Sequence, residues 1–219
     1  MRRKQRPIHR GARKELVSFL IQAATQWRLT GALLPSSAAL CHAMTDPLAR
    51  DSRAASRMIL EVGAGTGVIT EEIVPLMSPR DRLVVYELSE RLGERLKYRA
   101  KGPEWSGRDI EIRVKPFPEG TEDEHYNFAV CSLPFNNFPA YMVHICLKTF
   151  SKILTPGGVL TFYEYCHLRN LRLQFANRKE FIRLRRIDRT VKSFLKTHHG
   201  QCRHVLINVP PAWVYTIRF

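Results

Sequence analysis

Short segments rich in apolar residues alternate along the chain with longer segments whose apolar residues recur at helical spacing. The first kind predicts strands at 58–62, 82–87, 109–114, 126–131 and 159–165, and the second predicts helices at 38–44, 68–76, 89–101, 141–154 and 177–199. Strands and helices that alternate in this way are typical of a parallel, doubly wound sheet. Residues 203–209 and 213–218 predict a closing pair of strands. We therefore expect an α/β fold with a seven-stranded, mostly parallel sheet and helices on both faces.

The first 30 residues differ from the rest of the chain in charge and in pattern. Residues 1–14 carry seven Lys and Arg residues and no acid, and an apolar stripe at helical spacing follows, formed by Leu16, Phe19, Leu20, Ala23 and Trp27. A basic arm that leads into such a helix is typical of helices that lie in a membrane interface. The alternative is that the stripe packs on the domain behind a free tail. We expect a basic arm and an amphipathic membrane-binding helix at 1–30, and one domain at 31–219.

The hydrophobic content of 44% is that of a globular protein, whereas a net charge of +15 implies an anionic partner, either a nucleic acid or an acidic lipid surface. The five cysteines form no Cys-x-x-Cys pair, so they indicate neither a zinc site nor a disulfide framework, and a reducing cytosol suits them. We expect no metal. Because no run of 18 apolar residues and no cleavage signal occur, we expect neither a membrane span nor a signal peptide.

Residues 58–67 read M-I-L-E-V-G-A-G-T-G, which predicts a buried strand and a tight glycine turn before the helix at 68–76. Glycine permits left-handed dihedrals and lets a ligand approach the backbone closely, although a plain strand-to-helix turn is the alternative. Glu87 ends the second strand, twenty residues past Gly67, and an acid at that tip can accept two ribose hydroxyls. Ser36 or Ser37 is a suitable N-cap for the next helix, whose free N–H groups can hold a carboxylate.

The stretch E-V-G-A-G-T-G at 61–67 resembles motif I of the class I S-adenosylmethionine (SAM) methyltransferases, and L-T-P-G-G-V-L at 154–160 resembles a turn of the same class. The resemblance implies a Rossmann-like fold, SAM as the methyl donor and S-adenosylhomocysteine (SAH) as the product. The residues expected to bind SAM are Pro35, Ser36, Glu61, Gly63, Ala64, Gly65, Thr66, Gly67, Glu87, Leu88, Ser132 and Leu133. The loop at 115–120 departs from the class, in which an acid after the third strand meets the adenine; Glu119 or a backbone group could take that place.

Ligands of an open parallel sheet bind beyond the carboxyl ends of its strands, where residues 132–137 and 163–165 are also expected. Methyl transfer from a sulfonium is an in-line displacement, in which the protein mainly aligns the nucleophile. We expect Asn136, Tyr163 and Tyr165 to orient an acceptor amine and Phe135 to contact the substrate, because aromatic faces attract a methylated ammonium. Core packing is the alternative for the aromatic residues.

Two methyltransferase families resemble the S-L-P-F segment at 132–135. The rRNA adenine dimethyltransferases have Asn where this chain has Ser132, and they carry a small helical RNA-binding domain where this chain is expected to end in a strand pair. The bacterial phospholipid N-methyltransferases, which methylate phosphatidylethanolamine towards phosphatidylcholine, resemble the chain from about residue 15 onward. The similar parts are the amphipathic helix, G-A-L-L-P-S-S, E-V-G-A-G-T-G, S-L-P-F-N-N-F, F-Y-E-Y and N-V-P-P-A-W-V.

This second resemblance implies a cytoplasmic enzyme held peripherally on the inner face of the membrane, with an anionic membrane surface and its phospholipid as partners. Trp27 is expected to contact the lipid, and Arg183 and Arg186 are expected to bind its phosphate, unless each arginine only faces solvent. We expect a monomer and no nucleic-acid partner. The alternative acceptors are an ornithine-type amino lipid and, in rRNA, the N6 of adenine; a SAM-binding module without catalysis is the alternative from another class.

Overall fold

The computed structural model describes residues 37–52, 56–121, 123–166 and 176–219, which fold around one seven-stranded sheet. The strands are β1 (Met58–Val62), β2 (Arg82–Tyr86), β3 (Asp109–Arg113), β4 (Tyr126–Cys131), β5 (Leu154–Tyr165), β6 (Gln201–Val205) and β7 (Ala212–Arg218). Their order across the sheet is β3-β2-β1-β4-β5-β7-β6. The first five strands are parallel, and β7 runs antiparallel to both β5 and β6. The predicted α/β fold with a mostly parallel sheet is therefore confirmed.

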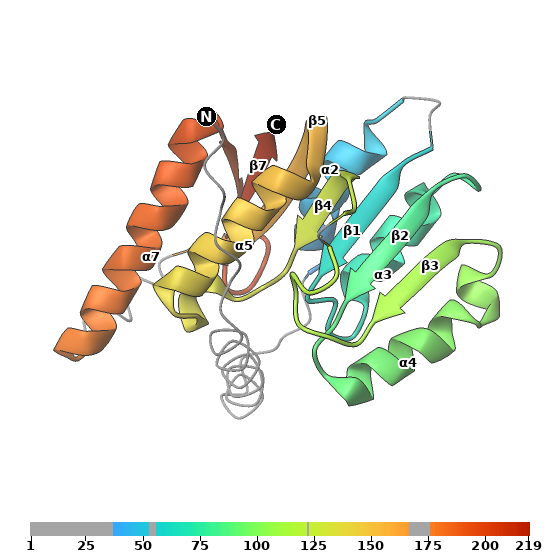
Figure 1. Ribbon diagram of the computed structural model, residues 1–219, viewed down its shortest axis with the longest axis horizontal. Coiled ribbons are helices and arrows are strands. Elements are labelled where there is room, and N and C mark those ends of the chain that lie inside the picture. Colours follow the sequence, from blue (N-terminus) through green and yellow to red (C-terminus); the bar gives the residue numbers. More distant parts are fainter. Residues whose placement is uncertain (1–36, 53–55, 122, 167–175) are drawn as a thin grey trace.

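Helices cover both faces of this sheet (Figure 1). One face carries α2 (Ala38–Ala49), α3 (Val68–Ile73) and α4 (Glu90–Ala100), and the other carries α5 (Ala140–Ile153) and α7 (Arg178–Thr197). Three short 3-10 turns complete the set, namely η1 (Val74–Leu76), η2 (Pro103–Trp105) and η3 (Phe135–Asn137). In the described part of the chain, no helix is both long enough and apolar enough to cross a membrane.

Alternation along the strands builds two separate cores, because successive side chains of a strand point to opposite faces. In β1, Ile59 packs with α2 and α3 on what we call the α2 face, whereas Leu60 packs with α5 on the α5 face. Strand β2 follows the same rule: Leu83 and Val85 pack on the α2 face, and Val84 and Tyr86 pack on the α5 face. Val84 and Val85 are both fully buried. A strand buried on both faces reads as a continuous apolar run, which is why the sequence pattern located β1 and β2.

The α5 face of β2 is covered by an irregular segment. The connection from β3 to β4 contains no helix among its described residues, and it places the ring of Phe117 against two neighbours. Phe117 stacks on Phe150 of α5 at 4.9 Å between ring centroids and meets Tyr86 edge-on at 5.6 Å. This aromatic group attaches the connection to the carboxyl end of β2, next to the site described below.

A buried ion pair fastens the amino edge of the sheet. The Arg57 guanidinium donates to Asp81 Oδ2 from Nε at 2.9 Å and to the carbonyls of Leu48 and Leu76 from its Nη atoms. Burial acts to raise the pKa of Asp81, but hydrogen bonds from Arg57 and Ser78 outweigh it, and the pKa is lowered. The pair therefore joins the end of α2, η1 and the starts of β1 and β2.

Several boundaries differ from those predicted. Helix α2 continues to Ala49 with Pro47 in its last turn, and β5 begins at Leu154, within the segment where the pattern indicated a turn. Strand β6 ends at Val205, so the predicted strand at 203–209 was wrong beyond that point. The amphipathic helix expected within 1–30 lies outside the described residues, as does the domain boundary at 30/31.

Candidate functional site

The carboxyl ends of β1, β2 and β4 are joined by backbone hydrogen bonds. The N–H groups of Gly63 and Ala64 donate to the carbonyl of Tyr86, at 2.8 and 3.3 Å, and Ser132 N–H donates to Val62 O at 2.8 Å. The loops that follow these strands therefore start from one continuous edge, which we call the carboxyl edge. Ligands of open parallel sheets bind at this position.

The glycine turn after β1 has the left-handed backbone that its sequence predicts. Gly63, Gly65 and Gly67 have φ values of 82°, 60° and 89°. A Cβ at Gly67 would lie 2.7 Å from Leu96 of α4, so this glycine permits helix packing. A Cβ at Gly65 would meet nothing within 4 Å, so this glycine leaves open space above the turn. The turn is thus packed against α4 at Gly67 and leaves space for a ligand at Gly65.

Glu87 is held against this turn by both of its carboxylate oxygens. Oε2 accepts the Gly65 N–H at 2.7 Å, and Oε1 accepts the N–H of Ser89, the N-cap of α4, at 2.7 Å. Only 8% of the residue is exposed. Backbone N–H groups at a helix start favour a negative charge, so the carboxylate is stabilised where it lies. The predicted acid at the tip of β2 and the predicted glycine turn are therefore in direct contact.

Glu61 lies beneath the turn, on the α2 face. It is fully buried, its Oε2 accepts a hydrogen bond from Thr70 Oγ1 of α3 at 2.7 Å, and Oε1 has no partner among the described residues. Burial raises the pKa of Glu61 to about 7, and the nearby charge of Glu87 adds to the rise, while the Thr70 bond opposes it. Glu61 supports the glycine turn from inside the core. Its expected contact with SAM, which the resemblance implied, stays a prediction.

The raised pKa of Glu61 makes the free energy of unfolding depend on pH. An acid whose pKa is higher in the folded protein than in the unfolded chain stabilises less as pH rises, here between about 4.5 and about 7. Glu61→Gln removes this titration. We expect the stability of the variant relative to the native protein to improve by on the order of 3 kcal/mol between pH 4.5 and pH 8. Chemical denaturation across that pH range measures it, and two curves that stay parallel would contradict the expectation.

The tip of β4 approaches the glycine turn closely. A Cβ at Gly63 would lie 3.1 Å from Leu133 Cδ2, so the two loops are in contact. The hydroxyl oxygen of Ser132 is buried and has no hydrogen-bond partner in the described part of the chain. Leu88, just past Glu87, is partly buried against the α5 face. The structure therefore brings Ser132 and Leu133 together with the turn, as the sequence predicted.

Tyr163 and Tyr165 lie at the end of β5, the next strand of the sheet. Cys131 pairs with Phe162, so Tyr163 follows at the level of Ser132. The two tyrosine rings form an edge-on pair with centroids 5.3 Å apart, and both side chains are partly exposed on the α2 face. Glu164 points to the opposite face and is only 6% exposed.

Phe135 lies in the core, and its expected contact with the substrate stays a prediction. It is 2% exposed and packs against Phe138 and Phe162, with ring centroids 6.4 and 5.6 Å away. The apolar character of the S-L-P-F segment reflects this packing. Asn136, the next residue of η3, is 9% exposed and its side chain also lies close to the core.

The guanidinium group of Arg183 makes hydrogen bonds within the protein. Its Nη1 donates to the carbonyl of Phe138 at 2.6 Å, and Nη2 donates to the carbonyl of Asn136 at 2.8 Å. Its Nε donates to Glu180 at 2.7 Å. With these donors engaged, Arg183 fixes the start of α7 on η3. Its role in phosphate binding stays a prediction. Arg186 is exposed on α7. Trp27, Pro35 and Ser36 lie outside the described residues.

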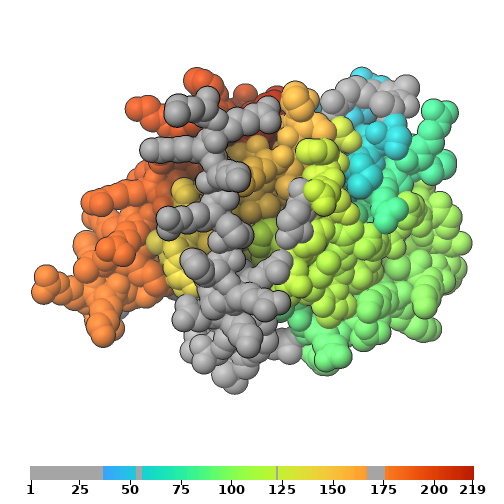
Figure 2. All heavy atoms as spheres, in the orientation of Figure 1, coloured from blue at the N-terminus to red at the C-terminus, as the bar shows by residue number. Residues whose placement is uncertain are grey.

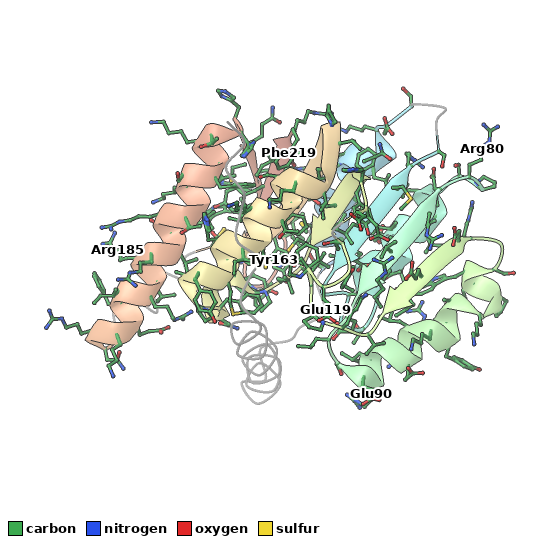
Figure 3. The ribbon with its side chains drawn as sticks, viewed as in Figure 1. Arg80, Glu90, Glu119, Tyr163, Arg185 and Phe219 are labelled. Carbon is green, nitrogen blue, oxygen red and sulfur yellow. The ribbon has the colours of Figure 1, made fainter. Side chains whose placement is uncertain are left out.

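The loop after β3, where Glu119 or a backbone group is expected to meet the adenine, is hydrogen-bonded to β2. Tyr86 Oη donates to the backbone carbonyl of Glu119 at 2.9 Å, and Arg113 Nη1 donates to Tyr86 Oη at 2.9 Å. Figure 3 shows Glu119 at the carboxyl edge of the sheet. The backbone of this residue is thus fixed by the protein, while its side chain remains partly exposed.

These features fit a nucleoside that carries an amino-acid tail. The Glu87 carboxylate at the tip of β2 suits ribose hydroxyls, the space above Gly65 suits a chain that passes close to the backbone, and the buried Ser132 oxygen provides a polar atom alongside. A glycine turn after β1, an acid after β2 and this strand order define the class I SAM methyltransferase fold. SAM is the cofactor of that class.

Comparison with known proteins agrees with this class. Residues 59–158 match a family described as a methyltransferase domain. The fold is that of the class I SAM-dependent methyltransferases, and the matched segment contains the glycine turn, Glu87 and Ser132.

Solved structures share the fold at low sequence identity. An O-methyltransferase from Bacillus cereus in complex with SAH is 15% identical, with a TM-score of 0.56 over 92% of this chain and 100% of that chain. A precorrin-6y C5,15-methyltransferase from Geobacter metallireducens is 15% identical, with a TM-score of 0.56 over 80% of this chain and 86% of that chain. A ribosomal protein L11 methylase from Lactobacillus delbrueckii is 11% identical, with a TM-score of 0.52 over 80% and 77%. Because the names of these proteins specify different acceptors, the shared fold does not define the acceptor of this chain.

Proposed function

We propose that this methyltransferase transfers the methyl group of SAM to the amine head group of a membrane phospholipid, converting phosphatidylethanolamine towards phosphatidylcholine. The observation that carries the proposal is the pair of tyrosines, Tyr163 and Tyr165, at the strand end beside Ser132. The faces of two aromatic rings attract an alkylated ammonium more than they attract a neutral oxygen or carbon acceptor. The net charge of +15 further favours an anionic surface as the place of reaction.

The residues of the chain position the reactants. When bound, SAM supplies an electrophilic methyl group on a sulfonium. Glu87 would hold its ribose and the glycine turn would hold its amino-acid chain, and the buried Ser132 oxygen lies on the side of the turn that faces β5. Asn136 is proposed to accept an N–H of the amine, and Arg183 stabilises this residue through its backbone carbonyl. Alignment of the amine lone pair with the methyl group contributes to catalysis because the two reactants no longer have to meet in solution.

Incubation of the full chain with methyl-labelled SAM and a set of acceptors tests the proposal. The acceptors are vesicles of phosphatidylethanolamine, vesicles of an ornithine-type amino lipid, vesicles of phosphatidylcholine alone, and ribosomal RNA. We expect label in methylated phosphatidylethanolamine on thin-layer separation and none in phosphatidylcholine vesicles. Label confined to RNA, or to the ornithine-type lipid, would overturn the assignment of the acceptor.

The tyrosine pair predicts a step-dependent defect. Tyr165→Leu removes an aromatic face that attracts the ammonium as it gains methyl groups. We expect the later methylations to slow by about threefold to thirtyfold, since a cation–π contact contributes about 0.5–2 kcal/mol. Tyr165→Phe keeps the face and should retain the native ratio of mono- to trimethylated product. An equal slowing of all steps in both variants would assign Tyr165 to packing.

A further inference from the structure

The loop between β6 and β7, residues 206–211, presents apolar side chains to solvent. Leu206 is 71% exposed, Ile207 is 83% exposed and Val209 is 69% exposed. Isolated apolar residues on a surface are ordinary, but three on one short loop form a patch that water solvates poorly. Such a patch indicates a contact surface.

This loop lies at the carboxyl edge, together with the candidate site. The first residue of β7, Ala212, pairs with the last residue of β6, Val205, on one side. On its other side Ala212 pairs with Tyr165, the last residue of β5. Because Tyr165 is part of the proposed amine site, the loop projects from the same edge of the sheet as that site.

The backbone of the loop is held in place by its one buried polar side chain. Asn208 is 2% exposed, its Oδ1 accepts the N–H of Ser37 at the start of α2 at 3.0 Å, and its Nδ2 donates to the carbonyl of Pro210 at 2.6 Å. The carbonyl of Pro211 accepts the N–H of Cys166 at 2.7 Å. The apolar side chains beside Asn208 are thus displayed by a fixed scaffold, so little conformational entropy is lost when they are buried.

The other exposed large apolar side chains gather at the same edge. Among the described residues, seven large apolar side chains are exposed, and these are Tyr98, Tyr141, Phe181, Ile182, Leu206, Ile207 and Val209. Six of them lie at the carboxyl edge, because α5 begins there after η3, and Arg183 attaches the first turns of α7 to η3. Figure 2 shows these first turns of α7 projecting from the body of the molecule. Only Tyr98, in the second half of α4, lies elsewhere.

Positive charge lies beside the apolar residues at the start of α7. Residues 178–189 contain six Lys and Arg residues and two acids, Glu180 and Asp188. Both acids are paired within the chain, with Arg183 and Lys192. Arg185 and Arg186 are exposed next to Phe181 and Ile182, and Arg185 points away from the body of the protein (Figure 3). Apolar side chains set among cations match an anionic bilayer, whose surface attracts basic residues and whose interior accepts apolar ones.

We propose that loop 206–211 inserts into an anionic phospholipid bilayer and, with the first turns of α7, docks the carboxyl edge of the enzyme on the membrane. This inference rests on the proposed function, because a lipid acceptor has to reach that edge. It names a contact separate from the amphipathic segment predicted near the N-terminus. The docked edge would face the head groups, so an amine could reach the strand ends without leaving the membrane.

Flotation of the full chain with vesicles tests the loop. The variant changes Leu206, Ile207 and Val209 to Ser and keeps Asn208, and the matched control is Tyr98→Ser, a change of an exposed apolar residue away from the edge. On vesicles of phosphatidylethanolamine and phosphatidylglycerol, we expect the triple variant to bind at least about tenfold more weakly and the control to bind as the native chain does. Native-like binding of the triple variant would overturn the proposal.

Insertion itself is measured by fluorescence. Tryptophan placed as Ile207→Trp should be quenched by vesicles whose acyl chains carry bromine, whereas Tyr98→Trp should not be quenched beyond the native background. A second copy of the chain is the competing occupant of the loop. If the native protein were a dimer without vesicles, and the triple variant a monomer that still binds vesicles, the loop would be a protein interface and the proposal would fail.

A short-chain phosphatidylethanolamine below its micelle concentration separates this inference from the proposed function. We expect the triple variant to methylate this dispersed substrate at the native rate while losing turnover on vesicles. If no lipid is methylated by the native chain but binding still depends on the loop, the proposed acceptor fails and the docking surface stands. If both substrates are methylated equally by the native chain and the triple variant, the docking surface fails and the acceptor stands.

Discussion

Replacement of Glu87 by alanine is expected to weaken SAM binding by about a hundredfold or more. The carboxylate is placed to accept hydrogen bonds from the ribose, and hydrogen bonds to a charged group contribute about 1.5–3 kcal/mol each. Two such bonds correspond to a loss of about two to four powers of ten in affinity. The change also leaves the N–H groups of Gly65 and Ser89 without their present acceptor. Titration calorimetry with SAM and with SAH measures the effect.

The matched control for this experiment is Glu90→Ala. Glu90 is an exposed acid in the first turn of α4, the helix that begins just after Glu87, and Figure 3 shows it at the lower margin of the molecule. It therefore lies near the same helix N-terminus as Glu87 but outside the contact with the glycine turn. We expect Glu90→Ala to bind SAM as the native protein does. Unchanged SAM affinity in a folded Glu87→Ala protein would refute the role of Glu87 in binding the ribose.

Replacement of Gly65 by alanine is expected to weaken SAM binding by about tenfold to a hundredfold. The added methyl group enters the open space above the turn, and overfilling a packed site costs about 1–3 kcal/mol. Alanine also carries a backbone penalty at φ 60°, of about 1–2 kcal/mol in protein stability. The two effects have to be separated before the loss of binding can be assigned to the site.

Gly157 provides that separation. Its φ is 78°, a Cβ there would also meet nothing within 4 Å, and it lies near the start of β5, at the edge of the sheet opposite the site. Gly157→Ala should therefore show a similar loss of thermal stability with native SAM affinity. A comparable loss of affinity in both variants would mean that backbone strain, and not occupation of the donor space, explains the Gly65 result.

The parts of the fold that the sequence predicted correctly are governed by local pattern. Strand β1, the glycine turn and Glu87 follow one another within thirty residues, and each has a residue type that only one local structure accommodates well. Both cores of the sheet could be anticipated because strands buried on two faces must be continuously apolar. The parallel arrangement of the first five strands follows from their regular alternation with helices.

The parts that sequence pattern missed depend on contacts between distant residues. Arg183 resembles the other arginines of α7 in sequence, and only its hydrogen bonds to the carbonyls of Phe138 and Asn136, 45 and 47 positions away, distinguish it. Phe135 could be a ligand contact or a core residue until the position of Phe162 on β5 is known. Glu61 shows the same limit, since its burial under α3 arises from tertiary packing that the motif alone does not define.

In the proposed reaction, SAM has to enter and SAH has to leave at the carboxyl edge while the strands keep their register. At the amino edge, the guanidinium of Arg57 bonds to α2, to η1 and to Asp81. Breaking the buried Arg57–Asp81 ion pair would cost about 3–5 kcal/mol. Thermal breathing is therefore rare there. We therefore expect the amino edge of the sheet to stay rigid. Exchange of SAM and SAH then requires only small movements of the loops at the carboxyl edge.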